Sequence, residues 1–304
     1  MIRIPTAGLT REEWLGLRRQ GIGGSEAAAV CGVNPYRSPM SVYLDKLGEL
    51  PEEGDAGERA YWGTVLEDIV ARHYAEVNGA KVRRVNYILI DAERPYMLAN
   101  LDREAIKDGE RYGYEGKTTD SRNAAAWEND GVPLNYQYQV QHYMSVTGLA
   151  FFDVACLIGG NRYVQRRVYR DDELIEAIRE AEASFWLGVE TRTPPAWDGS
   201  ADGWEVIKKL HPTSEPGKEI ALPEELAGTL ETYLRLEACR KACAAELKAT
   251  EQERDMYKQE LCAAMGDAET AHLNGYTLSY KTTTRKGYTT EDKTVRLFSL
   301  KEDK

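Results

Sequence analysis

Two carboxylates and a lysine stand at a spacing that suits the hydrolysis of phosphodiester bonds. Asp102 ends the run Met97–Asp102, and twelve residues separate it from Glu115-Gly116-Lys117. On a strand, side chains two residues apart share a face, so Glu115 and Lys117 point one way and Gly116 the other. Carboxylate oxygens suit Mg²⁺ or Mn²⁺, and a nearby ammonium can orient water and offset phosphate charge. Alone the spacing is weak, because neighbouring strands often carry paired charges.

A third carboxylate, Glu67, is predicted to lie on a helix with small and apolar neighbours at helical spacing, from Gly63 to Tyr74. Such a carboxylate is expected to be partly buried, which is costly unless the charge is paired or binds a metal. Glu67 is therefore either a ligand of the same ion or one half of a buried salt bridge to an arginine. Asp68, by contrast, is predicted to form an exposed pair with Arg72.

These side chains need a helix and several strands to position them. A helix is predicted over 58–77, followed by extended segments over 81–90, 97–106 and 111–118. Asp108-Gly109 between the last two segments is typical of a hairpin turn. The other predicted elements are helices near 10–20, 26–31 and 39–48, helices over 121–129 and 133–147, strands over 151–158 and 163–169, and a helix over 171–187.

This order of elements indicates an α/β (α+β) fold, with a central mixed sheet flanked by helices. Pro194-Pro195 marks a boundary, so we assign residues 1–195 to one domain. Residues 196–222 are rich in Pro, Gly and charge and are predicted to be a linker or extended loop. Residues 223–304 are predicted to form a C-terminal extension, a long charged helix or helical hairpin followed by a β-hairpin over 276–288.

The composition excludes some classes of protein. The 304 residues include 39 Lys and Arg against 50 Asp and Glu, a net charge of −11, which disfavours a protein that coats nucleic acid through bulk positive charge. A local DNA site stays open. Five scattered cysteines with no C-x-x-C pair disfavour zinc, and a reduced cytoplasmic compartment is expected. No apolar run approaches the ~20 residues that span a bilayer, and no signal peptide is expected.

Five motifs occur in order between residues 10 and 170. They are Arg18–Glu26 with Asn34–Pro39, Gly63–Glu67, Met97–Asp102, Glu115–Thr118 and Val140–Met144. Together they resemble the YqaJ-type viral recombinase family, which is similar to lambda exonuclease and belongs to the PD-(D/E)XK nucleases. The resemblance implies a restriction-endonuclease-like core, and it weakens after about residue 195.

The resemblance also implies roles for the matching residues. The metal-binding carboxylates would be Glu67, Asp102 and Glu115, and Lys117 would be the catalytic lysine. The backbone carbonyl of Gly116, between two site residues, is counted with the metal ligands. The expected cofactor is Mg²⁺ or Mn²⁺, two ions per site.

Three further residues take roles from the resemblance. Arg18 and Ser25 would hold the terminal 5′-phosphate of DNA, and Gln141 would line the catalytic site. A phosphate at Ser25 is physically sensible because Ser25 follows two glycines at a predicted helix start. The alternatives are that Ser25 is only an N-cap, and that Gln137 and Gln141 form an exposed polar stripe.

The expected function is a metal-dependent exonuclease of phage or prophage origin that degrades linear double-stranded DNA, 5′ to 3′, in the bacterial cytoplasm. By family analogy it would supply single strands to an annealing protein and assemble as a homo-oligomer, a ring trimer. One alternative is an endonuclease or a single-strand-specific nuclease on the same scaffold. Another is a non-catalytic DNA-binding or scaffolding subunit. The basic run over 162–170 either contacts the DNA backbone or is a solvated edge strand.

Overall fold

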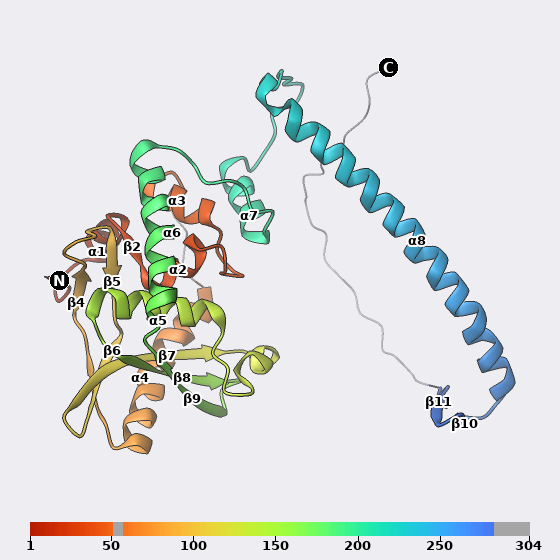
Figure 1. Ribbon diagram of the computed structural model, residues 1–304, viewed down its shortest axis with the longest axis horizontal. Helices are drawn as coiled ribbons and strands as arrows, with labels where there is room; N and C mark the ends of the chain where they lie inside the picture. Colours follow the sequence, from red (N-terminus) through yellow and green to blue (C-terminus); the bar gives the residue numbers. More distant parts are fainter. Residues whose placement is uncertain (51–56, 283–304) are drawn as a thin grey trace. The chain divides into compact units, whose positions relative to one another are not determined.

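The computed structural model describes residues 1–50 and 57–282, and the chain divides into two compact units after Pro212 (Figure 1). The first unit, Met1–Pro212, contains every residue that was assigned a chemical role above. The second unit begins at Thr213. Residues 283–304, including the end of the hairpin predicted over 276–288, lie outside the described residues.

A five-stranded mixed sheet forms the centre of the first unit, in the order β3-β6-β7-β8-β9. β7 and β8 run parallel, and the other neighbouring pairs run antiparallel. A parallel pair needs a crossover connection, which η1 (Ser121–Trp127) and α5 (Leu134–Thr147) supply. The predicted central mixed sheet is confirmed. Its strands are β3 (Lys81–Arg84), β6 (Arg103–Lys107), β7 (Glu110–Thr119), β8 (Phe151–Ile158) and β9 (Arg162–Tyr169).

Helices cover both faces of this sheet (Figure 1). α4 (Gly57–Asn78) packs on one face, where Tyr74 and Ala155 share a buried cluster. α5 packs on the other face, where Val140 and Val154 share a second cluster. Because successive side chains of a strand alternate, β8 contributes to both clusters and is buried on both sides. The result is a helix–sheet–helix arrangement around two cores.

A second, four-stranded sheet changes the prediction for the strands. Its order is β1-β4-β5-β2, formed by β1 (Ile2–Pro5), β4 (Tyr87–Ile90), β5 (Met97–Ala99) and β2 (Ile22–Gly23). The prediction of single strands over 81–90 and 97–106 is therefore wrong, since each breaks into two strands that belong to different sheets. The cause is non-local: β1 and β2, from the start of the chain, pair with β4 and β5.

The segment between β3 and β4 and the segment between β5 and β6 lie side by side. The amide of Val85, in the first break, donates a hydrogen bond of 3.3 Å to the carbonyl of Asp102, in the second. Asn100 and Asp102 therefore lie in a link between two sheets rather than along one strand. This link brings Asp102 to the place where the two sheets separate.

Local signals predicted helix starts well. Thr10 caps α1 (Arg11–Arg19): its Oγ1 accepts from the amide of Glu13 at 3.2 Å, and its own amide donates to Glu13 Oε2 at 2.8 Å. Ser38 caps α3 (Pro39–Leu47), with proline at the first helical position. α2 (Gly24–Val30) and α6 (Asp172–Thr191) are two further helices of the first unit.

The predicted linker over 196–222 is wrong in one part. Residues Ala201–Leu210 form helix α7, capped by Ser200. Val206 of this helix is buried with Met40 and Leu44 of α3, and Asp202 accepts a hydrogen bond of 2.7 Å from the Ser38 amide. A short amphipathic helix between Pro- and Gly-rich stretches has little local signal, and α7 is stabilised by packing on α3.

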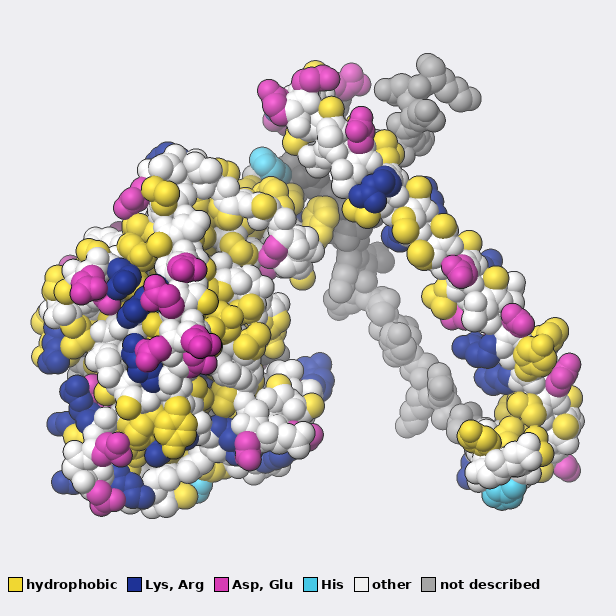
Figure 2. All heavy atoms as spheres, viewed as in Figure 1, with side chains coloured by type: hydrophobic (Ala, Val, Ile, Leu, Met, Phe, Trp, Pro, Cys, Tyr) yellow, Lys and Arg dark blue, Asp and Glu magenta, His cyan; other side chains and the backbone are white. Residues whose placement is uncertain are grey.

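The second unit contains η2 (Glu224–Leu226), α8 (Ala227–Met265), β10 (Thr270–Leu273) and β11 (Tyr276–Ser279). α8 is a single helix, so the helical-hairpin alternative is wrong. Figure 2 shows side chains of both charges along α8. The first unit also carries both signs on the face shown there, so that face has no single basic field. Within residues 1–50 and 57–282, no helix is long and apolar enough to cross a membrane.

A buried ion pair joins α5, α6 and β5. His142 Nδ1 lies 2.7 Å from Glu182 Oε1, and His142 Nε2 lies 2.9 Å from the carbonyl oxygen of Leu98. Both side chains are fully buried. Only the doubly protonated imidazolium can donate from both nitrogens. Burial opposes this charge, but Glu182 and, more weakly, Glu26 raise the pKa of His142 above its ordinary value.

Stability is therefore expected to fall with rising pH through this pair. Because the pKa of His142 is higher in the folded than in the unfolded state, its charge contributes its full stabilisation below the unfolded pKa of about 6.5. This stabilisation is lost as the pH rises through the folded-state pKa. At pH 6, His142→Leu should lower the free energy of unfolding by about 3–5 kcal/mol, because it leaves Glu182 buried and unpaired. Urea unfolding should show that the difference in unfolding free energy between wild type and His142→Leu becomes smaller towards pH 9. A gap that stays constant would contradict the charged pair, and adding Glu182→Gln should recover part of the loss.

Candidate active site

Glu115 and Lys117 of β7 face α5 together, as strand alternation predicts. Lys117 Nζ lies 2.8 Å from Glu115 Oε1. Gln139 of α5 bridges the two: it accepts from Lys117 Nζ at 3.0 Å and donates to Glu115 Oε1 at 2.8 Å. Lys117 also lies over the ring of Tyr136, 4.7 Å from its centre. Burial would lower the pKa of Lys117, but the attraction of Glu115 outweighs it and raises that pKa, so the side chain is an ammonium.

A cavity of about 250 Å³ opens over this pair, and we call it the catalytic cavity. Asp102 lines it from the link between β5 and β6. Burial and the nearby carboxylates of Glu115 and Glu67 raise the pKa of Asp102 to about 8, although Lys117 works in the opposite direction. Acidic side chains are thus gathered here with too little positive charge to balance them. The full lining is Trp14, Arg18, Gly23, Gly24, Ser25, Ile88, Leu98, Asn100, Asp102, Glu115, Lys117, Gln139 and Tyr143.

The acidic groups fit a divalent cation in their chemistry. Glu115 is buried, and its Oε2 is an acceptor without a hydrogen-bond partner. An orphaned carboxylate oxygen beside a carboxyl of raised pKa is what a hard cation would satisfy. In the described part of the chain, however, no three His, Cys, Asp or Glu side chains already converge as a metal site. Gly116 lies between Glu115 and Lys117 in β7, and its carbonyl as a ligand stays a prediction.

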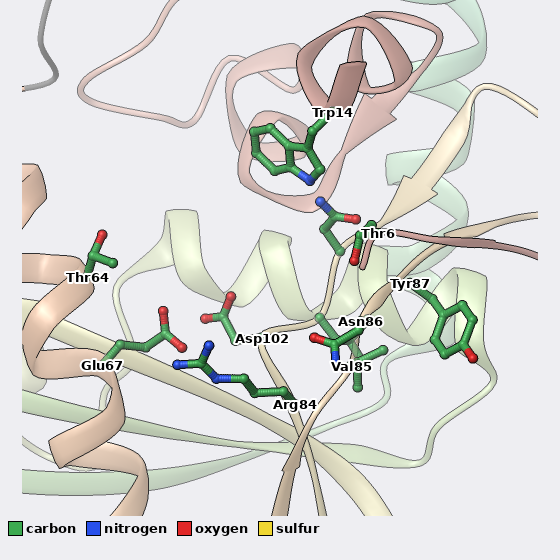
Figure 3. Close-up of a pocket in the computed structure, with 11 residues that line it drawn as sticks. Thr6, Trp14, Thr64, Glu67, Arg84, Val85, Asn86, Tyr87 and Asp102 are labelled. Carbon is green, nitrogen blue, oxygen red and sulfur yellow. The ribbon is translucent and has the colours of Figure 1, made fainter. Parts of the chain in front are cut away.

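Glu67 reaches Asp102 from the other side. It lines a second cavity, of about 240 Å³, which shares Trp14, Asn100 and Asp102 with the catalytic cavity. Figure 3 shows Glu67 and Arg84 pointing towards Asp102 from α4 and β3. The full lining of the second cavity is Thr6, Trp14, Thr64, Glu67, Arg84, Val85, Asn86, Tyr87, Asn100, Leu101 and Asp102.

Glu67 also forms a salt bridge to an arginine, the alternative to metal binding that the sequence left open. Arg103 Nη2 lies 2.9 Å from Glu67 Oε1, and the same nitrogen contacts Asp68. Arg103 is buried, whereas the Glu67 side chain is 30% exposed. The predicted exposed pair of Asp68 with Arg72 is wrong, because Asp68 accepts from Arg84 instead, at 2.7 and 2.8 Å.

Arg18 and Ser25 also line the catalytic cavity, where they contact each other. Arg18 Nη2 donates to Ser25 Oγ at 3.2 Å, and its guanidinium lies 4.8 Å from the centre of the Trp14 ring. The N-cap of α2 is Gly23, so the alternative that Ser25 is only an N-cap is wrong. Ser25 is exposed. A Cβ on Gly24 would come within 2.3 Å of the Tyr143 ring, so only glycine allows α2 to lie this close to α5.

A buried carboxylate holds this corner in place. Glu26 Oε2 accepts from Lys46 Nζ at 2.7 Å and from the Gly23 amide at 2.8 Å, and Arg37 and Arg18 approach Glu26 Oε1 at 3.3 and 3.8 Å. Burial would raise the pKa of Glu26, but the three cations hold it below its usual value. Arg37 also pairs with Asp45 at 2.8 Å, so two carboxylates face the three cations and one positive charge is left over beside the part of the cavity that Arg18 lines.

Gln141 lies away from the catalytic cavity, contrary to the prediction. Its Nε2 donates to the carbonyl of Tyr169 at 2.7 Å, and its Oε1 accepts from the Asp171 amide at 3.0 Å. Gln141 is buried, so the exposed polar stripe is wrong too. Gln139, two residues earlier and on the opposite side of α5, takes the place at Glu115 and Lys117. The sequence places Gln139 on the side of α5 opposite Gln141, but it does not show which side meets β7.

The basic run over 162–170 is engaged within the protein. Arg167 forms two hydrogen bonds to Asp153, at 2.7 and 2.9 Å. Arg166 donates to the carbonyl of Trp127 and Arg170 to the carbonyl of Met144. These contacts disfavour a DNA-backbone role for most of the run and favour the edge-strand alternative.

Comparison with known proteins gives three findings. Residues 13–150 match the family model described as the YqaJ-like viral recombinase domain. The chain is 38% identical over 281 residues to the protein YqaJ of Bacillus subtilis (strain 168), covering 90% of this chain and 84% of that protein. Among solved structures, the alkaline exonuclease LHK-Exo of Laribacter hongkongensis is similar with a TM-score of 0.47 and 20% identity, over 60% of this chain and 94% of that one. A phage-related exonuclease from Haemophilus somnus has a TM-score of 0.40 and 12% identity, over 57% and 94%.

Proposed function

This chain belongs to the YqaJ-like viral recombinase family, and we propose that it is a metal-dependent exonuclease that hydrolyses linear double-stranded DNA from its 5′ ends. One observation carries the proposal. Arg18, Ser25, Asp102, Glu115 and Lys117 come from distant parts of the sequence and line one cavity. A corner with excess positive charge thus lies in the same cavity as a carboxylate–lysine cluster, and this combination supports hydrolysis next to a terminal phosphate.

In this proposal each side chain has a defined task. Asp102 and Glu115 would hold the divalent cations, and Glu67, now paired with Arg103, would be the third carboxylate ligand. Bound Mg²⁺ or Mn²⁺, two ions per site, would neutralise phosphate charge and activate water. Lys117, as an ammonium, donates to the scissile phosphate and stabilises the charge that develops on its oxygens. Gln139 positions Lys117 and Glu115 relative to each other.

The 5′-to-3′ direction follows from Arg18 and Ser25. If they hold the terminal 5′-phosphate, the first phosphodiester bond lies at the carboxylates, and one nucleotide leaves in each cycle. From family membership we further propose that the exposed strand passes to a single-strand annealing protein, that the enzyme assembles as a ring trimer, and that it acts in the cytoplasm of a bacterial host of its phage or prophage. We assign these activities to residues 1–195, with α7 packed against them and 223–304 as an extension.

The test is digestion of end-labelled linear duplex with Mg²⁺, comparing 5′-phosphate with 5′-hydroxyl ends. The 5′-phosphorylated end should be cut faster and release mononucleotides. Ser25→Ala should lose most of this preference and cut hydroxyl ends at the wild-type rate, since it removes one hydrogen bond to the phosphate. Ser214→Ala, an exposed serine outside both cavities, is the matched control. Efficient cutting of a closed circle would instead support an endonuclease, and DNA binding without hydrolysis would support a scaffolding subunit.

Gln139 and Gln141 provide a paired prediction. Gln139→Leu should lower the rate of hydrolysis about 10- to 100-fold, because it removes hydrogen bonds to two charged groups worth about 1.5–3 kcal/mol each. Gln141→Leu should leave the rate of the folded enzyme unchanged and lower the free energy of unfolding by about 1–3 kcal/mol, because the Tyr169 carbonyl and Asp171 amide lose their partner. Initial rates and urea unfolding of both variants check this. The reverse pattern of losses would restore Gln141 to the site.

A further inference from the structure

We propose that the second cavity binds the nucleoside on the 3′ side of the scissile bond, the one that becomes the new 5′ end after each cut. This inference rests on the proposed exonuclease function. The two cavities share Asp102, Asn100 and Trp14, so they meet at the place where the scissile phosphate must lie. A nucleotide with its 5′-phosphate at Arg18 fills the catalytic cavity. The strand then continues past Asp102, and the second cavity is what it meets there.

The lining of the second cavity suits a base and sugar rather than another phosphate. Its cation, Arg84, is engaged by Asp68 in a two-oxygen pair. The carboxylates Glu67 and Asp102 also line the cavity, and their charge would repel a second phosphate. The other lining side chains are neutral: polar, as with Thr6 and Asn86, aromatic, as with Trp14, or aliphatic (Figure 3). Aromatic faces stack on bases of any sequence, and amides and hydroxyls hydrogen-bond to base edges and sugar oxygens. Tolerance of sequence is what a processive exonuclease needs at this position.

Unused hydrogen-bonding capacity lies in the lining of the second cavity. Asn100, which lines both cavities, has a buried Oδ1 without a partner. Among the described residues, the side-chain amide of Asn86 and the side-chain hydroxyl of Thr6, at the rim of the cavity, form no hydrogen bond. A buried acceptor left unpaired costs free energy, and such groups call for a ligand or water to satisfy them.

The rim is held firmly enough to be a preformed site. The Thr6 amide donates to the Asn86 carbonyl at 3.0 Å, and the adjoining Pro5 and Tyr87 are partners in the β1–β4 ladder. Trp14 is fixed from the other side by the Arg18 guanidinium over its ring. The same tryptophan therefore borders the site of the departing nucleotide and the site of the next one. After release, the strand needs to move by a single nucleotide to bring the new end to Arg18.

The test uses 5′-phosphorylated duplexes that differ only in the second nucleotide of the cleaved strand, which is either normal or abasic. Wild-type enzyme should cut the first bond of the abasic substrate about 5- to 100-fold more slowly, the range that loss of one stacked base gives. Asn86→Ala and Thr6→Val should slow the normal substrate, and should slow the abasic substrate less, because the lost base was their partner. Asn123→Ala and Thr193→Val, which line neither cavity, are the matched controls.

The outcomes separate this inference from the function on which it rests. If wild-type enzyme does not cut the normal substrate, the proposed function itself fails. If it cuts normal and abasic substrates equally, or if the rim variants slow both to the same extent, the second cavity does not hold this nucleoside and the exonuclease assignment stands. Preference for 5′-phosphate should be unchanged in Asn86→Ala and lost in Ser25→Ala. Loss of that preference in Asn86→Ala would overturn the separate roles of the two cavities.

Discussion

Lys117→Met is expected to slow the hydrolysis of linear duplex DNA about 10³-fold or more, while DNA binding stays close to that of the wild type. The ammonium is the cation that contacts Glu115, and a positioned charge or proton donor at a reacting phosphate contributes about 10²–10⁴ in rate. Methionine keeps the length of the aliphatic part of the lysine side chain and removes only the ammonium, so Tyr136 and Gln139 stay covered. The measurement is the initial rate of nucleotide release, with a gel-shift assay in Ca²⁺ for binding.

The control for this prediction is Lys107→Met, which removes an exposed lysine at the end of β6. It should leave the rate within about twofold of the wild type, as expected of a surface change away from the site. If Lys117→Met retained near-normal turnover, the charge at this position would have no part in the chemistry. A loss of rate with an equal loss of DNA binding would make Lys117 a binding residue instead.

Asp102→Asn is expected to abolish hydrolysis and, in a chelator, to stabilise the protein. When the pKa of an acid is higher in the folded than in the unfolded state, the protein loses stability as the pH rises from the unfolded pKa to the folded pKa. For Asp102 these two pKa values are about 3.9 and about 8. Above pH 8 the half-buried carboxylate is ionised and poorly compensated. Asparagine removes that charge, so the free energy of unfolding in EDTA at pH 8.5 should rise by about 1–3 kcal/mol.

Mg²⁺ should make the wild-type protein more stable than Asp102→Asn, the reverse of their order in EDTA. A ligand at 100 times its Kd stabilises by about 2.7 kcal/mol, so wild-type protein should gain stability on titration and Asp102→Asn should gain little. Thermal unfolding with and without Mg²⁺ measures both effects. Asp108→Asn, in the exposed β6–β7 turn, is the matched control and should behave as wild type. Equal stabilisation of wild type and Asp102→Asn by Mg²⁺ would exclude Asp102 from the metal ligands.

Short-range signals in the sequence predicted their own structures well. The capping box at Thr10 and Glu13 forms as predicted, and Asp108-Gly109 forms the turn between β6 and β7, with both residues at positive φ. The same holds for Glu115 and Lys117, whose shared face depends only on the alternation of one strand. Each of these features depends on residues within a few positions of one another.

Features that depend on distant partners were missed. The breaks at 85–86 and 100–102 exist because β1 and β2 pair with strands some 70 residues or more away, and nothing local marks them. For α5 the sequence has Gln137 and Gln141 on one side and Gln139 on the other, and only the position of β7 selects Gln139 over Gln141. The engagement of Glu67 by Arg103 was one of two predicted outcomes, and spacing alone could not choose between them.

The parallel pairing of β7 with β8 has a consequence for synthesis of the chain on the ribosome. β7 carries Glu115 and Lys117, yet one of its two neighbours, β8, begins only at Phe151, and His142 finds Glu182 later still. The two neighbours of β7 therefore become available at very different times, and folding of such non-local contacts waits for the later one. A nascent chain that ends before α6 lacks a framework for the cavity, so newly made protein acquires its reactive centre only when nearly two thirds of the chain has been translated.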